Sequence, residues 1–191
     1  VLIFISGVNI YILLAIFIAG ASLLAYFIIY VPRFDYIQGR IFSFFNRETG
    51  THNFQSDKAI ESITSGGFFG KGIGEGVLKN RVPEAHTDYI ISVISEEFGV
   101  VAIMLILLLF LILIYMVFKK ISFETNDKVK LILIGSISLI LMQATIHVGV
   151  NIRLFPTTGM TLPFLSYGGS SIISTSILAG IILNLTKRKI T

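Results

Sequence analysis

Four apolar segments, each long enough to cross a lipid bilayer as a helix, constrain this chain more than any other feature. Crossing about 30 Å of hydrocarbon takes roughly 20 helical residues. Leu, Ile and Phe dominate the segments, without the two-residue alternation of a membrane barrel. Only 14% of all residues are charged, against about a quarter in soluble proteins. The sequence therefore predicts an all-α integral membrane protein, a polytopic bundle of four transmembrane helices at residues 8–31, 90–118, 131–150 and 168–185.

Composition also removes several classes of function. The chain has no cysteine, which excludes disulfides, cysteine-ligated zinc and thiol catalysis. The net charge is +4, but tryptophan is absent and no aromatic residues are spaced along basic loops, which argues against a nucleic-acid surface. The chain starts with Val1 and shows no signal peptide, so we expect one membrane domain over residues 1–191 that is a segment of a longer protein.

Lysine and arginine in the short connections predict the orientation. Both the connection after the second span and the tail after the fourth are basic, which places them in the cytoplasm. The long connection, residues 32–87, and the link 151–167 then face outward. The long connection is itself rich in Lys and Arg, but acidic residues are interleaved and its length is near the limit of the rule. The basic residues that decide the orientation are Lys119, Lys120, Lys128, Lys130, Lys187, Arg188 and Lys189.

The long outer loop carries two local patterns. Ala59, Ile60 and Ile63 recur at helical spacing before a glycine-rich stretch, which predicts a short amphipathic helix ended by glycine. The glycine-rich stretch, GGFFGKGIGEG at residues 66–76, contains Lys71. It could be a flexible interfacial turn, or it could offer backbone amides and one ammonium to a phosphate.

The segment PEAHTDYIISVISEEFG, residues 83–99, places acidic residues and a histidine before an apolar run. Asp88 could be a helix N-cap, but Glu84, His86 and Arg81 crowd the same edge, which is more than capping requires. On a helical wheel, Asp88 shares a small and polar stripe with Ser92, Ser95 and Gly99. Glu96 and Glu97, further along the helix, are expected to form a structural ion pair or a path for protons or substrate.

Polar groups recur near the third and fourth spans. Gln143, His147 and Asn151 lie on one face of the third span, which favours hydrogen bonding between helices over a metal site. The next segment, FPTTGMTLPFLSYGGSS at residues 155–171, is too rich in proline, glycine and hydroxyl residues for a regular helix. It is expected to fold back as a re-entrant loop, with amides at the start of the fourth helix available to an anionic head group.

These two segments resemble the signatures of the SEDS (FtsW/RodA/SpoVE) family of bacterial cell-wall proteins. RIFSFFN, FQ and SGGFFGKG also occur in the family's order, and the resemblance covers nearly the whole chain. Within the family, FQSDKAIESITSGGFFGKGIGEG and PEAHTDYI are most similar to the cell-division branch, FtsW. The chain departs from the family pattern at Ile73, His147 and Arg153. The resemblance implies the C-terminal four of ten spans, which should be inactive alone.

The resemblance also implies a peptidoglycan glycosyltransferase that polymerises lipid II on the outer face of the bacterial inner membrane. It implies Asp88 as the catalytic base. The substrate contacts expected around it are Glu84, His86, Lys71, Arg81, Ser166, Gly168, Gly169 and Ser170, and the intramembrane polar residues are Glu96, Glu97, Gln143 and His147.

No cofactor is readable from the sequence, although a divalent cation such as Mg²⁺ or Mn²⁺ could assist departure of the diphosphate. The expected partners are an FtsI-like class B penicillin-binding transpeptidase and other divisome proteins. Two other functions stay open: a lipid II flippase, and a non-catalytic divisome scaffold.

Overall fold

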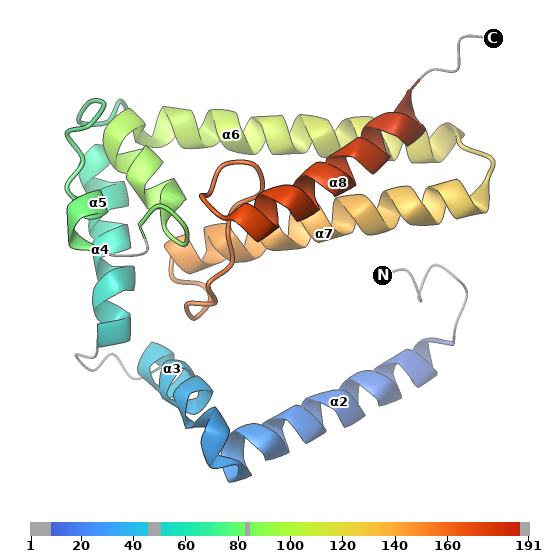
Figure 1. Ribbon diagram of the computed structural model, residues 1–191, viewed down its shortest axis with the longest axis horizontal. Helices are drawn as coiled ribbons and strands as arrows, with labels where there is room; N and C mark the ends of the chain where they lie inside the picture. The colour runs from blue at the N-terminus through green and yellow to red at the C-terminus, as the bar shows by residue number, and fades with distance from the viewer. Residues whose placement is uncertain (1–8, 46–50, 83–84, 188–191) are drawn as a thin grey trace. The chain divides into compact units, whose positions relative to one another are not determined.

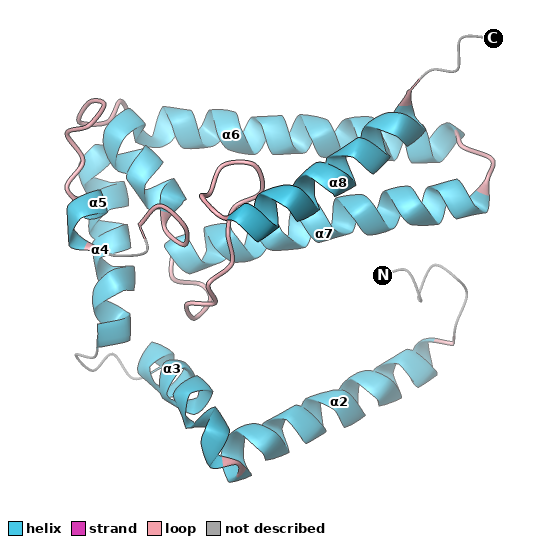
Figure 2. Ribbon diagram, in the orientation of Figure 1, coloured by secondary structure: helices cyan, strands magenta, loops and turns pink. Residues whose placement is uncertain are grey.

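The computed structural model describes residues 9–45, 51–82 and 85–187, and this part of the chain consists of helices, turns and loops without a strand (Figures 1 and 2). The chain divides into two compact units, Val1–Asn53 and Phe54–Thr191. Each is described by itself, and the expectation of a single membrane domain stays a prediction.

The first unit contains one apolar helix followed by an amphipathic one. Helix α2, Ile10–Tyr30, begins after Asn9, whose side chain accepts a hydrogen bond from the Tyr11 amide at 3.0 Å. It ends at Tyr30, and the next residue, Val31, has extended backbone, because a proline such as Pro32 disfavours helical backbone in the residue preceding it. A short 3₁₀ turn, η1 (Pro32–Phe34), leads into α3, Asp35–Phe45. The aromatic-rich residues 34–45 therefore lie in helical structure.

The second unit is built on an antiparallel pair of long helices. Helices α6, Ile90–Phe123, and α7, Asp127–Asn151, are joined by three residues, and α8, Gly169–Thr186, packs across them (Figure 1). Their shared core is aliphatic and consists of Val117, Leu133, Ile137, Ile140 and Ile182. Two shorter helices, α4 (Thr51–Gly66) and α5 (Leu78–Arg81), precede α6.

Both helix predictions are confirmed for the described residues. Helices α2, α6, α7 and α8 are long and apolar enough to cross a membrane. Helix α4 ends at Gly66, as the pattern before the glycine-rich stretch predicts.

The second span departs from a straight helix at Gly99. Its φ of 78° and ψ of −179° are not helical, and the residues before it form a separate short helix at a steep angle to the rest of α6 (Figure 1). We call this piece, residues 90–98, the short segment of α6. The expectation of one continuous helix over 90–118 is therefore wrong.

The glycine-rich loop replaces the helix hydrogen bonds that the break removes. The amides of Lys71 and Gly72 donate to the carbonyls of Glu96 and Glu97, at 2.9 and 3.1 Å. In return, Val100 and Val101 donate to carbonyls of the loop, those of Gly67 and Phe68. In an unbroken helix, the 96 and 97 carbonyls would accept from residues 100 and 101. The loop is thus held in the break by backbone hydrogen bonds, and the interpretation of it as a flexible turn is wrong.

Replacing Gly99 with alanine should destabilise the fold by more than about 2 kcal/mol, since left-handed backbone alone costs roughly 1–2 kcal/mol for other residues. A Cβ at Gly99 would also overlap the Phe68 carbonyl. The matched control is Gly180→Ala in α8, where a Cβ meets nothing within 4 Å and the change should be neutral or slightly stabilising. Unfolding by SDS titration in mixed micelles measures both, and equal stability of the two variants would contradict the role of the break.

Candidate functional site

The turn that carries Asp88 is hydrogen-bonded to the loop before α8. Residues 85–89 form this turn. The hydroxyl of Ser166 donates to the Thr87 carbonyl at 2.8 Å, and the Tyr167 amide donates to the His86 carbonyl at 3.1 Å. Ser166 is buried, and its oxygen also accepts from the Leu162 amide at 2.8 Å. The two segments that the sequence singled out therefore meet in space.

Asp88 is half-buried at this junction. One of its carboxylate oxygens lies 3.8 Å from where a Cβ on Gly159 would stand, so the carboxylate faces the loop between α7 and α8. The N-cap of α6 is Tyr89, with no side-chain hydrogen bond at the cap, and Asp88 stands outside the capping position. The neighbouring Tyr89 side chain is buried, and its hydroxyl lies 3.4 Å from the Ser56 hydroxyl of α4.

The other predicted contacts divide into two groups. His86, Ser166 and the start of α8 lie at or beside the Asp88 turn, where Gly168 has extended backbone and Gly169 and Ser170 are exposed. Glu84 lies outside the described residues. Lys71 and Arg81, by contrast, line a polar cavity beside α4 and α5.

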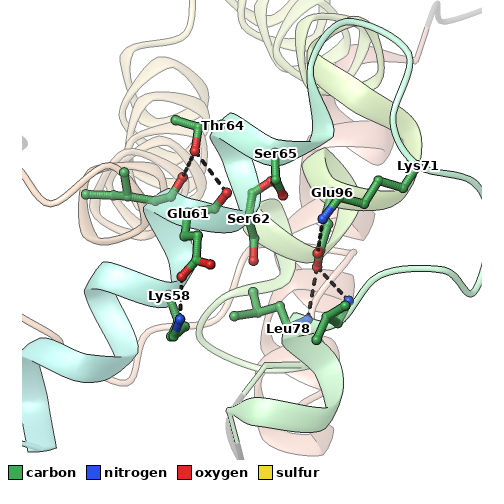
Figure 3. A network of polar contacts seen from close by, with 10 residues as sticks. Lys58, Glu61, Ser62, Thr64, Ser65, Lys71, Leu78 and Glu96 are labelled. Carbon is green, nitrogen blue, oxygen red and sulfur yellow. Dashed lines mark hydrogen bonds and ion pairs between the residues drawn. The ribbon is translucent and has the colours of Figure 1, made fainter.

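This polar cavity has a volume of about 160 Å³ and is organised by Glu96. The Glu96 side chain is 3% exposed. One of its oxygens accepts from the amides of Val77 and Leu78, each at 3.0 Å, and the other from the Lys71 ammonium at 2.9 Å (Figure 3). Of the two alternatives for Glu96, the structure shows the ion pair.

Two further cations reach the cavity. Lys58 hydrogen-bonds to Glu61 on the same helix, and this bond, with the charge of Lys58, holds the pKa of Glu61 below its usual value. Arg81 also lines the cavity. Three cations and two carboxylates line this cavity, so its lining carries one excess positive charge.

Gln143 and His147 hold the re-entrant loop against α7. The Gln143 amide nitrogen donates to the Thr161 carbonyl at 2.9 Å and to the Ser171 hydroxyl at 3.0 Å. The fully buried His147 ring is hydrogen-bonded through Nδ1 to the Met160 carbonyl at 2.8 Å. The predicted hydrogen bonding between helices is confirmed for Gln143, which bonds to Ser171 of α8, whereas the partner of His147 lies in the loop. Across the described ranges, no group of three His, Cys, Asp or Glu residues is placed to hold a metal.

Comparison with known proteins settles the family. Residues 1–190 match the family model FTSW_RODA_SPOVE, described as cell cycle protein. The chain belongs to this family.

Similar curated proteins carry a common name, probable peptidoglycan glycosyltransferase FtsW. The chain is 39% identical to the one from Enterococcus hirae over 72% of its own length and 35% of that protein. It is 38% identical to the one from Trichlorobacter lovleyi, over 90% of this chain and 46% of that protein. The chain thus spans less than half the length of these relatives.

A solved structure is also similar. It concerns the structural coordination of polymerization and crosslinking by a peptidoglycan synthase complex. The TM-score is 0.72 at 28% identity, over 97% of this chain and 51% of that one. The polytopic helical fold predicted from the sequence is that of the FtsW/RodA/SpoVE family.

The site also contains contacts that the sequence did not indicate. Asn151 was placed on a polar face with Gln143 and His147, but its partners are the backbone of Asp88 and both polar groups of Ser92. The signal was present in the pattern, because Ser92 lies on the small stripe of Asp88. The pattern of polar residues along one helix gives no indication of which face of another helix it contacts.

Removing the Glu96 side chain should cost about 2 kcal/mol of stability, because it leaves the buried Leu78 amide, the partly buried Val77 amide and the Lys71 ammonium without their acceptor. We expect this loss for Glu96→Ala, measured by SDS unfolding in mixed micelles. The matched control, Lys58→Met, breaks the exposed pair with Glu61 and should cost less than about 1 kcal/mol. Similar losses for both variants would show that Glu96 does not organise the cavity.

Proposed function

We propose that the protein carrying this sequence is a peptidoglycan glycosyltransferase of cell division, which polymerises lipid II into glycan strands on the outer face of the bacterial inner membrane. The observation that supports this most is the junction at Asp88, where a half-buried carboxylate lies between the α6 turn and the re-entrant loop. The names of the similar proteins support the same reaction.

The chemistry requires a base and a place for developing negative charge. The 4-hydroxyl of one disaccharide attacks the anomeric carbon of another, the bond to undecaprenyl diphosphate breaks, and the configuration inverts. Asp88 accepts the hydroxyl proton as the new bond forms. The leaving diphosphate needs hydrogen-bond donors and cations. The donors that we propose for the diphosphate are the start of α8, at Gly168, Gly169 and Ser170, and the side chain of His86.

Lys71 and Arg81 stay predicted contacts of the substrate. They line the polar cavity, and Lys71 already serves as partner to Glu96, so their contact with a diphosphate would require that cavity to open toward Asp88. A divalent cation such as Mg²⁺ or Mn²⁺ stays a proposed aid to departure of the diphosphate. Among the described residues, no group of three His, Cys, Asp or Glu is placed to hold it.

The proposed partners are an FtsI-like class B penicillin-binding transpeptidase and other divisome proteins. The similar solved structure, which concerns a complex that coordinates polymerization and crosslinking, supports this assembly. Four helices able to cross a membrane support a multi-pass protein, and the basic connections support an outward-facing site.

Asp88→Asn should reduce glycan polymerisation at least about 100-fold, since a positioned general base contributes roughly 10²–10⁴. The measurement uses the complete protein encoded by the gene, purified with its transpeptidase and given labelled lipid II. The control is Asp57→Asn, a carboxylate that pairs with Arg153 outside the junction and should leave polymerisation within about twofold.

The outcomes separate the three functions. Equal polymer from wild type and Asp88→Asn would remove Asp88 from the reaction. No polymer from either, with lipid II still crossing vesicle membranes, would indicate a flippase. Normal division by cells carrying Asp88→Asn, together with loss of division on changes in the outer loop, would indicate a scaffold.

A further inference from the structure

The side-chain amide of Asn151, the last residue of α7, is inserted into the first turn of α6. Its nitrogen donates to the Asp88 carbonyl at 3.0 Å, and its oxygen accepts from the Ser92 amide at 3.2 Å. In a regular helix, the amide of residue 92 would donate directly to the carbonyl of residue 88. The carboxamide of Asn151 thus bridges the two backbone groups that a further helical turn would join.

This bridge uses every hydrogen-bonding position of the carboxamide. The nitrogen has a second acceptor, the His147 carbonyl at 2.9 Å, and the oxygen has a second donor, the Ser92 hydroxyl at 2.7 Å. Asn151 and Ser92 are both fully buried. A carboxamide has two N–H groups and two lone pairs, so the contact is saturated, and the geometry at Asp88 is determined by a group on another helix.

The consequence concerns the conformation of Asp88. Without the bridge, the buried Ser92 amide would lose its acceptor, at a cost of roughly 1–3 kcal/mol, unless it bonded to the Asp88 carbonyl. That bond extends α6 by a turn and turns the Asp88 side chain with it. The bridge therefore holds Asp88 in the turn, where the carboxylate faces Gly159.

We infer that Asn151 is a positioning residue for Asp88, which keeps the first turn of α6 open so that the carboxylate faces the substrate. This inference rests on the proposed function, in which Asp88 is the base. It assigns to the end of α7 a role in the reaction beyond holding the bundle together. A misplacement of about 1 Å can lower a rate by roughly 10²-fold, so loss of the bridge should act on kcat.

The experiment compares six forms of the complete protein with its transpeptidase: wild type, Asp88→Asn, Asn151→Ala, Asn151→Asp, Ser92→Ala and the control Thr175→Val. Asn151→Ala removes the whole bridge, and Asn151→Asp keeps the acceptor for Ser92 but loses the donor to Asp88. Ser92→Ala removes one hydroxyl and keeps the backbone bond. Polymerisation of labelled lipid II gives kcat and KM for each form, and thermal unfolding in micelles reports its stability.

A control with equal burial separates positioning from stability. Thr175→Val in α8 removes a hydroxyl from a side chain that is 1% exposed and bonds only within its own helix. We expect both Asn151 variants to lose 10- to 100-fold in kcat with KM within threefold. Ser92→Ala, which removes one of the four bonds of the carboxamide, should lose less in kcat than either Asn151 variant, and Thr175→Val should stay within threefold of wild type in both constants.

Other outcomes would overturn the positioning role or the proposed function. Wild-type activity of Asp88→Asn overturns the proposed function itself. An inactive Asp88→Asn with a normal kcat for Asn151→Ala overturns the positioning role. A raised KM at unchanged kcat assigns Asn151 to substrate binding instead. If Asn151→Ala does not fold, Asn151→Asp is judged by the same criterion, and failure of both to fold shows a role in folding alone.

Discussion

The arrangement of this site depends on backbone hydrogen bonds that the short segment of α6 does not make with its own helix. At its C-terminal end, the glycine-rich loop bonds to the 96 and 97 carbonyls and to the amides of Val100 and Val101. At its N-terminal end, the Asn151 carboxamide stands between the Asp88 carbonyl and the Ser92 amide. A helix held at both ends by other parts of the fold has little freedom to lengthen, shift or unwind. Asp88, which lies immediately before it, acquires a fixed place.

Glycine makes the first of these attachments possible. A Cβ at Gly66, Gly70 or Gly99 would overlap backbone atoms of the segment that it faces. Because these residues have no side chain, the backbones of the loop and of α6 come close enough to hydrogen-bond to each other. Glu96 adds a charged anchor at the same place, because its carboxylate joins α5 and Lys71 to the short segment. The high glycine content, which in the sequence suggested flexibility, here permits close backbone contact between the loop and α6.

The spans and the two signature segments could be identified from the sequence, because they depend on local composition and on resemblance. Apolar length placed α2, α6, α7 and α8, and helical spacing placed α4. The break at Gly99 could not be placed, since a single glycine within a helical pattern is commonly tolerated. It becomes a break only because the loop 66–76 supplies the missing hydrogen bonds. The bridge by Asn151 could not be predicted for the same reason, because it joins residues that are 59 or more positions apart in the chain.

The break also separates two requirements that a straight span would have to meet together. The part of α6 after Gly99, residues 100–123, is ~36 Å long at 1.5 Å per residue, which is enough to cross about 30 Å of hydrocarbon. The short segment is consequently not needed for crossing, and its direction can be set by the Asp88 turn, the Asn151 bridge and the cavity around Glu96. In the proposed reaction, Asp88 has to meet a lipid-linked sugar, so its carboxylate needs to lie at the edge of the apolar bundle and keep one orientation there. A span that ends at Gly99, with a separately anchored helix beyond it at residues 90–98, provides both.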